Sequence, residues 1–195
     1  MRHYELAPVP IPEPLWRLSA AALLGTSSPA WRLMRAGMLQ AANNSCETCG
    51  RPVKDGKGMV CDEMWHYTEG RGYGAALLVA LRMLCLQCDR ARHPGMAGVM
   101  NSKFPIYEHM MRVNGWTRRK TETVVEEAWR DFRRRSEMTW AVEVEPGLVR
   151  RWPALVVLNG QVGEPGDGTR RVAMARAARP ARRSVGGTQA NRSQR

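Results

Sequence analysis

Two Cys-x-x-Cys pairs decide the fold: Cys46-Glu47-Thr48-Cys49 and Cys85-Leu86-Gln87-Cys88. Each pair forms a knuckle, a tight turn that directs two thiolates at one point. Four thiolates complete the tetrahedral coordination of a structural Zn²⁺ ion, which stabilises a fold and leaves no coordination position open for chemistry. A dithiol redox pair and two disulfides are the alternatives, but a redox motif occurs singly beside a strand–helix unit. We therefore expect all four cysteines to bind one zinc ion.

Length and composition favour one cytoplasmic domain with appendages. The chain has 195 residues, and its hydrophobic fraction of 44% is sufficient for a core. Five cysteines are an odd number, which argues against a secreted disulfide framework and leaves Cys61 as a free, buried thiol. The apolar stretch 18–24 is too short to span a bilayer. It follows an acidic, proline-rich segment, so we do not interpret it as a signal peptide.

The net charge of +12 is concentrated at the C-terminal end. Eight arginines and no acidic residue follow Gly168, which leaves +4 for residues 1–167. Arginine-rich tails bind polyanions mainly through counterion release, with little sequence preference. We therefore expect nucleic-acid contacts, most simply with DNA, from the tail arginines Arg170, Arg171, Arg176, Arg179, Arg182 and Arg183.

Four segments are expected along the chain. They are an extended N-terminal arm laid on the surface (1–28), a zinc domain with C-terminal helices (29–144), a peripheral segment (145–160) and a disordered tail (161–195). Hydrophobic periodicity and turn residues predict the elements of the ordered part. These are helices over 29–43, 104–113 and 118–138, a short helix from the second knuckle to about residue 92, the second strand of a hairpin over 59–67, a closing strand over 140–144 and a peripheral strand within 151–159. Periodicity leaves 77–84 open between strand and helix.

Several short stretches make the chain resemble the HNH endonuclease superfamily, and in particular bacterial and phage HNH-like proteins. The resemblance covers roughly residues 14–144. It implies an α+β fold, with a small zinc-stabilised treble clef of the ββα-metal type and flanking helices. The matching stretches are Pro14-Leu15-Trp16, Trp31-Arg32, Cys46-Glu47-Thr48-Cys49-Gly50, the stretch Val60-Cys61-Asp62-Glu63-Met64-Trp65-His66-Tyr67, Leu84-Cys85-Leu86-Gln87-Cys88, His93-Pro94-Gly95-Met96-Ala97-Gly98 and Arg112-Val113-Asn114-Gly115-Trp116.

The resemblance also locates a reaction centre. In active members a histidine on the hairpin activates water, an asparagine precedes the second knuckle, and a histidine after the last cysteine binds the catalytic cation. These positions fall at Asp62, near Ala80 and at Asp89. Aspartate can bind Mg²⁺ or Mn²⁺, so Asp62, Glu63 and Asp89 would supply a carboxylate variant of the site. His93 is a candidate metal ligand or phosphate contact, or simply the residue that ends its helix.

Because all three positions differ from the motif, we expect a zinc-stabilised protein that binds nucleic acid without cutting it. A working metal-dependent endonuclease is the first alternative, and a structural or protein-interaction zinc module is the second. The run Arg130, Arg133, Arg134 and Arg135 is either a solvated helix face or a nucleic-acid contact. His66 and His93 are the only histidines that we expect near the knuckles, with His66 packed or at the surface.

Overall fold

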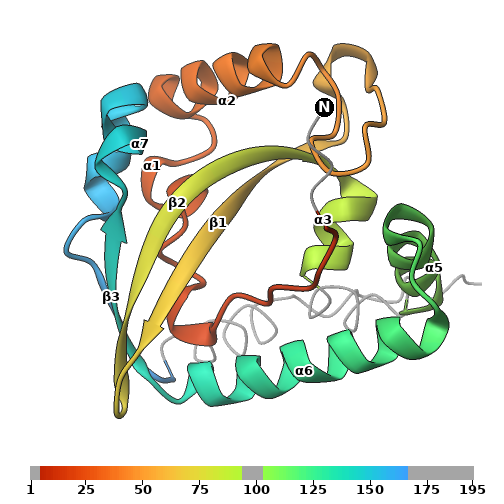
Figure 1. The fold of residues 1–195 in the computed structure, drawn as a ribbon. Coiled ribbons are helices and arrows are strands. Elements are labelled where there is room, and N and C mark those ends of the chain that lie inside the picture. Colours follow the sequence, from red (N-terminus) through yellow and green to blue (C-terminus); the bar gives the residue numbers. More distant parts are fainter. Residues whose placement is uncertain (1–4, 94–102, 167–195) are drawn as a thin grey trace, which may run out of the picture.

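A long antiparallel hairpin of β1 (Met59–Glu69) and β2 (Tyr73–Cys85) lies at the centre of the computed structural model, which describes residues 5–93 and 103–166 (Figure 1). The sheet has the order β1-β2-β3-β4. Strand β3 (Thr139–Val144) is parallel to β2, and β4 (Val162–Gly163) is antiparallel to β3. A parallel pair needs a long crossover, and here the crossover contains the helices that complete the fold. The α+β class and the closing strand are confirmed.

The hairpin settles the ambiguous segment 77–84 as strand. Its turn is short and contains Gly72 at φ 79°, a conformation that favours glycine. The register shifts between Met64, which pairs with Ala80, and Trp65, which pairs with Leu78, so Val79 is an extra residue in β2. The prediction that 59–67 is the second strand of a hairpin is wrong, because β1 is the first strand and pairs with β2.

Helix α2 (Pro29–Ala41) begins where a capping serine and a proline predicted it. The Ser28 hydroxyl accepts the N–H of Trp31, and Pro29 occupies the first turn. Trp31, Met34 and Met38 are buried on one face. The helix therefore packs by its apolar stripe, as the spacing indicated.

The crossover contains α3 (Leu86–Arg92), α5 (Lys103–Asn114) and α6 (Arg118–Ser136). Gly115 has φ 68° and ends α5, and the Thr117 hydroxyl accepts the N–H of Lys120 at the start of α6. These helices were predicted to within a few residues.

The peripheral strand predicted within 151–159 is wrong, because this segment is helical. Leu155 and Leu158 are the residues buried in it, a spacing of three that suits a 3₁₀ helix and not the alternation of a strand. Beyond it, β4 pairs with β3, so residues 161–166 belong to the folded body and not to a disordered tail. The remaining short elements are η1 (Glu13–Leu15), α1 (Ala20–Leu24), η2 (Lys54–Gly56), α7 (Pro146–Arg151) and η3 (Pro153–Leu158).

The prediction of an extended surface arm over 1–28 is right only in part. Residues 5–12 are extended, but residues 13–15 and 20–24 are helical, and the expected surface position is wrong. Leu6 and Leu15 are fully or almost fully buried. The backbone of Leu6 exchanges two hydrogen bonds with the Asn114 side chain, and Val9 N–H donates to the Arg92 carbonyl. In Figure 1 the red arm runs between the hairpin and α6. The arm is therefore part of the core and joins the ends of α3 and α5.

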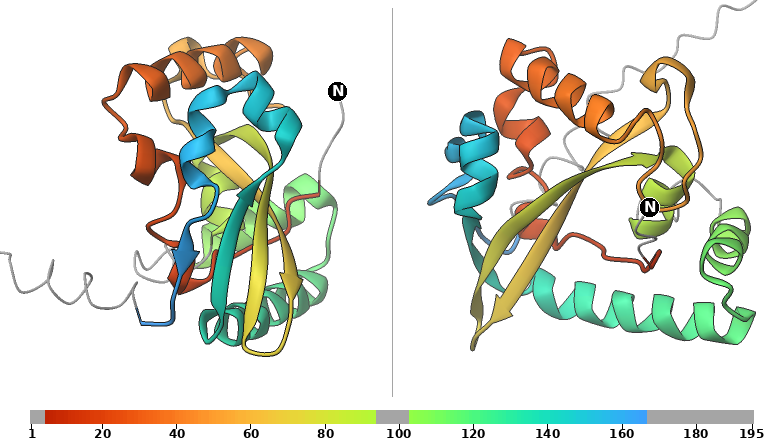
Figure 2. Two further views of the ribbon diagram at one scale, coloured as in Figure 1. Left: turned by 90° about the vertical axis from the view of Figure 1, so that its left-hand side faces the viewer. Right: turned by 45° about the horizontal axis from the view of Figure 1, so that its top comes forward.

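Helices α2 and α6 lie on opposite sides of the molecule with the hairpin between them (Figure 2). At the turn end of the hairpin, Arg134 and Arg135 of α6 form ion pairs with Glu69. At its other end lie both knuckles. Each helix within residues 5–93 and 103–166 is too short or too polar to span a bilayer. The tail arginines from Arg170 to Arg183 lie outside the described residues.

Candidate metal centres

The first knuckle follows α2 and is shaped by backbone hydrogen bonds. Cys46 N–H donates to the Arg51 carbonyl, Gly50 N–H donates to the Cys46 carbonyl, and Gly50 has φ 71°. Ser45 and Pro52 form an isolated antiparallel bridge that closes the loop. This local geometry directs Cys46 and Cys49 to the same side.

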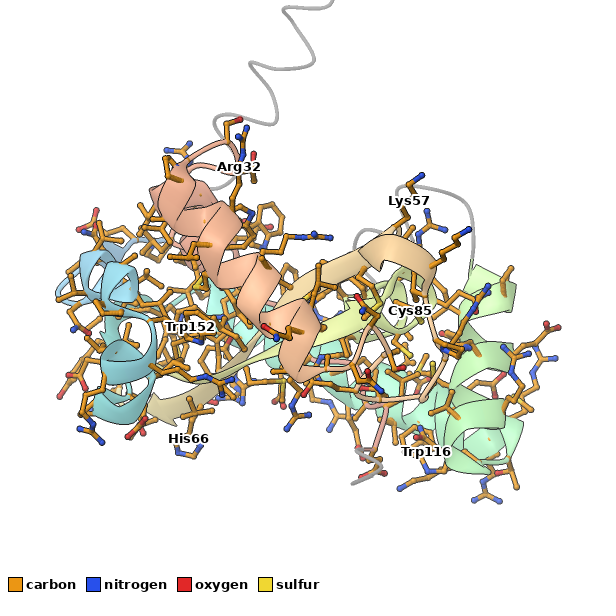
Figure 3. The ribbon with its side chains drawn as sticks, turned by 90° about the horizontal axis from the view of Figure 1, so that it is seen from above. Arg32, Lys57, His66, Cys85, Trp116 and Trp152 are labelled. Carbon is orange, nitrogen blue, oxygen red and sulfur yellow. The ribbon has the colours of Figure 1, made fainter. Side chains whose placement is uncertain are left out.

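The second knuckle joins β2 to α3. Cys85 is the last residue of β2 and the N-cap of α3, and Cys88 lies in the first turn of the helix. Glu47 connects the two knuckles, because its N–H donates to the Met83 carbonyl and its carboxylate accepts the Met83 N–H at 2.6 Å. Figure 3 shows Cys85 in the interior beside α3, whereas Lys57 projects outward from the loop before β1.

The four sulfur atoms lie within 4.8 Å of one another, and Cys46, Cys85 and Cys88 are buried. The Sγ atoms of Cys49 and Cys85 are 3.8 Å apart. With a Zn–S bond of about 2.3 Å, the edge of a regular tetrahedron is roughly 3.8 Å. The cluster therefore fits a four-coordinate metal such as zinc, as the spacing predicted, with Cys46, Cys49, Cys85 and Cys88 as ligands.

Neighbouring thiols in this cluster shift the pKa values of Cys46 and Cys49. Hydrogen bonds from Cys85 and Cys88 hold the pKa of Cys46 far below its usual range, whereas burial raises the pKa of Cys49 to about 11. One thiolate thus forms readily, and further thiolates are opposed by burial and by its charge. A bound cation would remove that opposition. Cys61 lies apart, 3.5 Å from the Met38 sulfur, and burial raises its pKa to about 12.

A second cluster is formed by Asp62 of β1 together with Asp89 in the first turn of α3 and His93, the C-cap of α3. Their ligand atoms also lie within 4.8 Å of one another. His93 Nε2 is 2.8 Å from Asp62 Oδ1, and Arg92 Nε is 2.7 Å from Asp62 Oδ2. The Asp62 side chain is only 1% exposed. The structure therefore brings together Asp62 and Asp89, which were the two carboxylates at motif positions, and the separate candidate His93.

Asp62 and Asp89 lie in different electrostatic environments within this cluster. Arg92 neutralises Asp62, but the two atoms in contact form no aligned hydrogen bond, so Asp62 Oδ2 lacks a hydrogen-bond donor. Burial raises the pKa of Asp89 above its usual range. The donor set of two carboxylates and an imidazole suits a divalent cation. The fit is partial, because the guanidinium of Arg92 already balances one of the negative charges.

Glu63 lies apart from the second cluster. Its Oε1 accepts the backbone N–H of Ala20 at 2.6 Å and thereby holds the start of α1, while burial raises the pKa of Glu63 to about 7. Ala80 pairs with Met64 in the hairpin and offers no polar side chain. His66 is exposed and projects from the hairpin in Figure 3. Of the predicted catalytic group, Asp62 and His93 are thus in contact, and Glu63 instead performs a structural task.

His109 of α5 is the residue that the sequence analysis missed. Its Nε2 is 3.1 Å from Cys88 Sγ, its Nδ1 is 2.9 Å from an Arg112 nitrogen, and it is 4% exposed. The expectation that only His66 and His93 lie near the knuckles is therefore wrong. A signal was present, because His109 falls among the apolar helix positions Ile106 and Met110, which are buried.

No family model matches the chain, and searches of curated proteins and of solved structures found no match.

Proposed function

We propose that this chain is a zinc-stabilised protein of the treble-clef type that binds nucleic acid without cutting it. The burial and ion pairing of Asp62 are the reason to expect no cleavage. A general base must reach the proton that it removes. Asp62 stands at the base position, yet it is 1% exposed, ion-paired with Arg92 and hydrogen-bonded to His93.

A zinc ion bound by the four cysteines would stabilise the fold. Cys46 and Cys85 come from segments that no continuous helix or strand joins, and one metal ion would cross-link them. Because metal-bound thiolates form together with the folded state, binding free energy is also folding free energy. A saturated tetrathiolate site has no open coordination position, so we assign it a structural role.

Nucleic-acid binding is supported by charge. The +12 net charge includes the eight arginines beyond Gly168, which have no acidic neighbours. In the described part of the chain, a cavity of about 380 Å³ beside Cys49 is lined by the exposed residues Arg51, Gln87 and Arg112. Guanidinium groups bind phosphate oxygens in two-pronged geometry. The run at Arg134 and Arg135 is less available, because Glu69 and Asp131 already pair with it.

The experiment is a binding titration against duplex DNA over a series of salt concentrations, with zinc-loaded full-length protein. We expect the logarithm of the affinity to fall linearly with the logarithm of the salt concentration. An acidic polymer of glutamate serves as a control for charge alone. Affinity that does not depend on salt, or no binding at low salt, would contradict this part of the proposal and favour a protein-interaction module.

A second function, metal-dependent hydrolysis of phosphodiesters, is favoured by one observation. Ligand atoms of Asp62, Asp89 and His93 converge to within 4.8 Å of one another. A divalent cation there would stabilise charge on the phosphate and on the leaving oxygen. Asp89 and His93 would hold the cation. If the wild type nicks DNA with Mg²⁺ or Mn²⁺, Asp89→Asn should abolish nicking and leave the zinc content unchanged, whereas Glu63→Gln should retain nicking.

A further inference from the structure

Two hydrogen bonds through His109 connect the zinc ligand Cys88 to the surface residue Arg112. The distances are 3.1 Å from His109 Nε2 to Cys88 Sγ and 2.9 Å from His109 Nδ1 to Arg112. His109 is buried, whereas Arg112 is exposed. The contact joins α5 to the second knuckle across the crossover and uses both nitrogens of the imidazole ring.

Arg112 decides which nitrogen of His109 carries the proton. A guanidinium group only donates hydrogen bonds, so Nδ1 must accept from it. A neutral imidazole then has its proton on Nε2, and this N–H points at Cys88 Sγ. In a doubly protonated ring, Nδ1–H of His109 would face the N–H of the Arg112 guanidinium, and two donors cannot form a hydrogen bond with each other.

We propose that His109 is a positioning residue of the zinc centre, which donates its Nε2–H to the Cys88 sulfur and is held in this tautomer by Arg112. Zinc bound by four thiolates carries a net charge of about −2. A hydrogen bond into one sulfur disperses part of that charge, stabilises the bound thiolate and lowers its reactivity towards electrophiles. This role depends on the zinc centre and not on nucleic-acid binding.

Second-sphere partners of metal ligands orient the ligand and set its donor strength, and losing one costs roughly 10–100-fold in metal affinity. In the usual arrangement, a histidine binds the metal and a carboxylate supports the histidine. Here a histidine supports a cysteine. The distinction matters because His109 itself lies outside the group of four convergent ligands.

The test compares wild type with His109→Leu, His109→Gln and Arg112→Leu in the full-length chain. Leucine removes the donor, and glutamine restores an N–H at a similar reach. Arg112 is exposed, so its replacement changes the tautomer preference with little effect on packing. Zinc affinity is measured by competition with a chelator. After exchange of zinc for Co²⁺, the sulfur-to-cobalt charge-transfer band reports the donor strength of the thiolates.

We expect His109→Leu to bind zinc about 10–100-fold more weakly and to shift the charge-transfer band to lower energy. His109→Gln should remain close to wild type, and Arg112→Leu should fall between the two. Glutamine and leucine variants that are equally weak would overturn the proposal, because ring packing or direct ligation would then matter instead. An unchanged leucine variant, or Arg112→Leu identical to wild type, would also overturn it. A wild-type chain that holds no metal refutes the zinc centre itself and this role with it.

Discussion

Replacing Arg92, a buried residue of α3, with methionine should destabilise the protein strongly. The ion pair with Asp62 is buried on both sides, with side-chain exposures of 6% and 1%. Breaking a buried pair by removing one partner costs about 3–5 kcal/mol, because the remaining charge stays buried without compensation. His93 still contacts Asp62 at 2.8 Å, so we expect the lower end, about 3 kcal/mol.

For a chain of this size, about 3 kcal/mol corresponds to a fall in Tm of roughly 6–12 °C. The assay is urea unfolding at saturating zinc, followed by tryptophan fluorescence. Arg90→Met is the matched control, since Arg90 is a neighbouring arginine on the same helix, and we expect it to change the unfolding free energy by less than about 0.5 kcal/mol. The double variant Asp62→Leu/Arg92→Met should recover much of the loss, because it leaves no unpaired charge. Equal costs for Arg92→Met and Arg90→Met would refute the buried pair.

Three further predictions address the metal, a buried carboxyl and the tail. Cys85→Ser, or chelation of wild type, should reduce bound zinc below one per chain and unfold the knuckles, as measured by elemental analysis and circular dichroism; a full zinc complement would contradict the ligand assignment. Burial raises the pKa of Glu63 to about 7, so the folded state keeps a proton that the unfolded state loses above about pH 4.5. Wild type should therefore lose about 2 kcal/mol relative to Glu63→Gln between pH 5 and 7, and parallel stability curves would contradict this. Truncation after Gly168 should weaken DNA binding and flatten its salt dependence without changing the fold, and an unchanged salt slope would exclude the tail as the contact.

The sequence predicted what local spacing controls. The two knuckles needed only a two-residue gap within each pair, and α2 needed only Ser28 and Pro29. The convergence of Asp62 with Asp89 and His93 was accessible through the resemblance, since Asp89 and His93 are four residues apart on one helix and share a face.

The N-terminal arm was misplaced for a physical reason. Its prolines remove backbone donors, and residues 5–12 are extended accordingly, although Pro14 is accommodated in the first turn of the short helix η1. The loss of donors says nothing about burial, however, and Leu6 and Leu15 are buried in the core. Long-range packing, which no local pattern encodes, decides where an extended segment lies.

His109 and Arg92 show the same limit at the candidate site. His109 reaches Cys88 only because the crossover returns α5 to the second knuckle, over a separation of 21 residues. Arg92 alters the chemistry of Asp62 by charge, and a motif comparison of positions 62 and 89 does not include residue 92. The grouping of the four cysteines was thus predictable, whereas the electrostatic state of the second cluster was not.

The claim that this protein binds nucleic acid without cutting it can be tested in one gel experiment. Supercoiled plasmid is incubated with stoichiometric zinc-loaded protein and Mg²⁺ or Mn²⁺, and it is run on a gel before and after the protein is removed. We predict retarded migration before removal and unchanged supercoiled plasmid afterwards. Nicked or linear plasmid from the wild type, absent with Asp89→Asn, would contradict the account and establish the second cluster as an active centre.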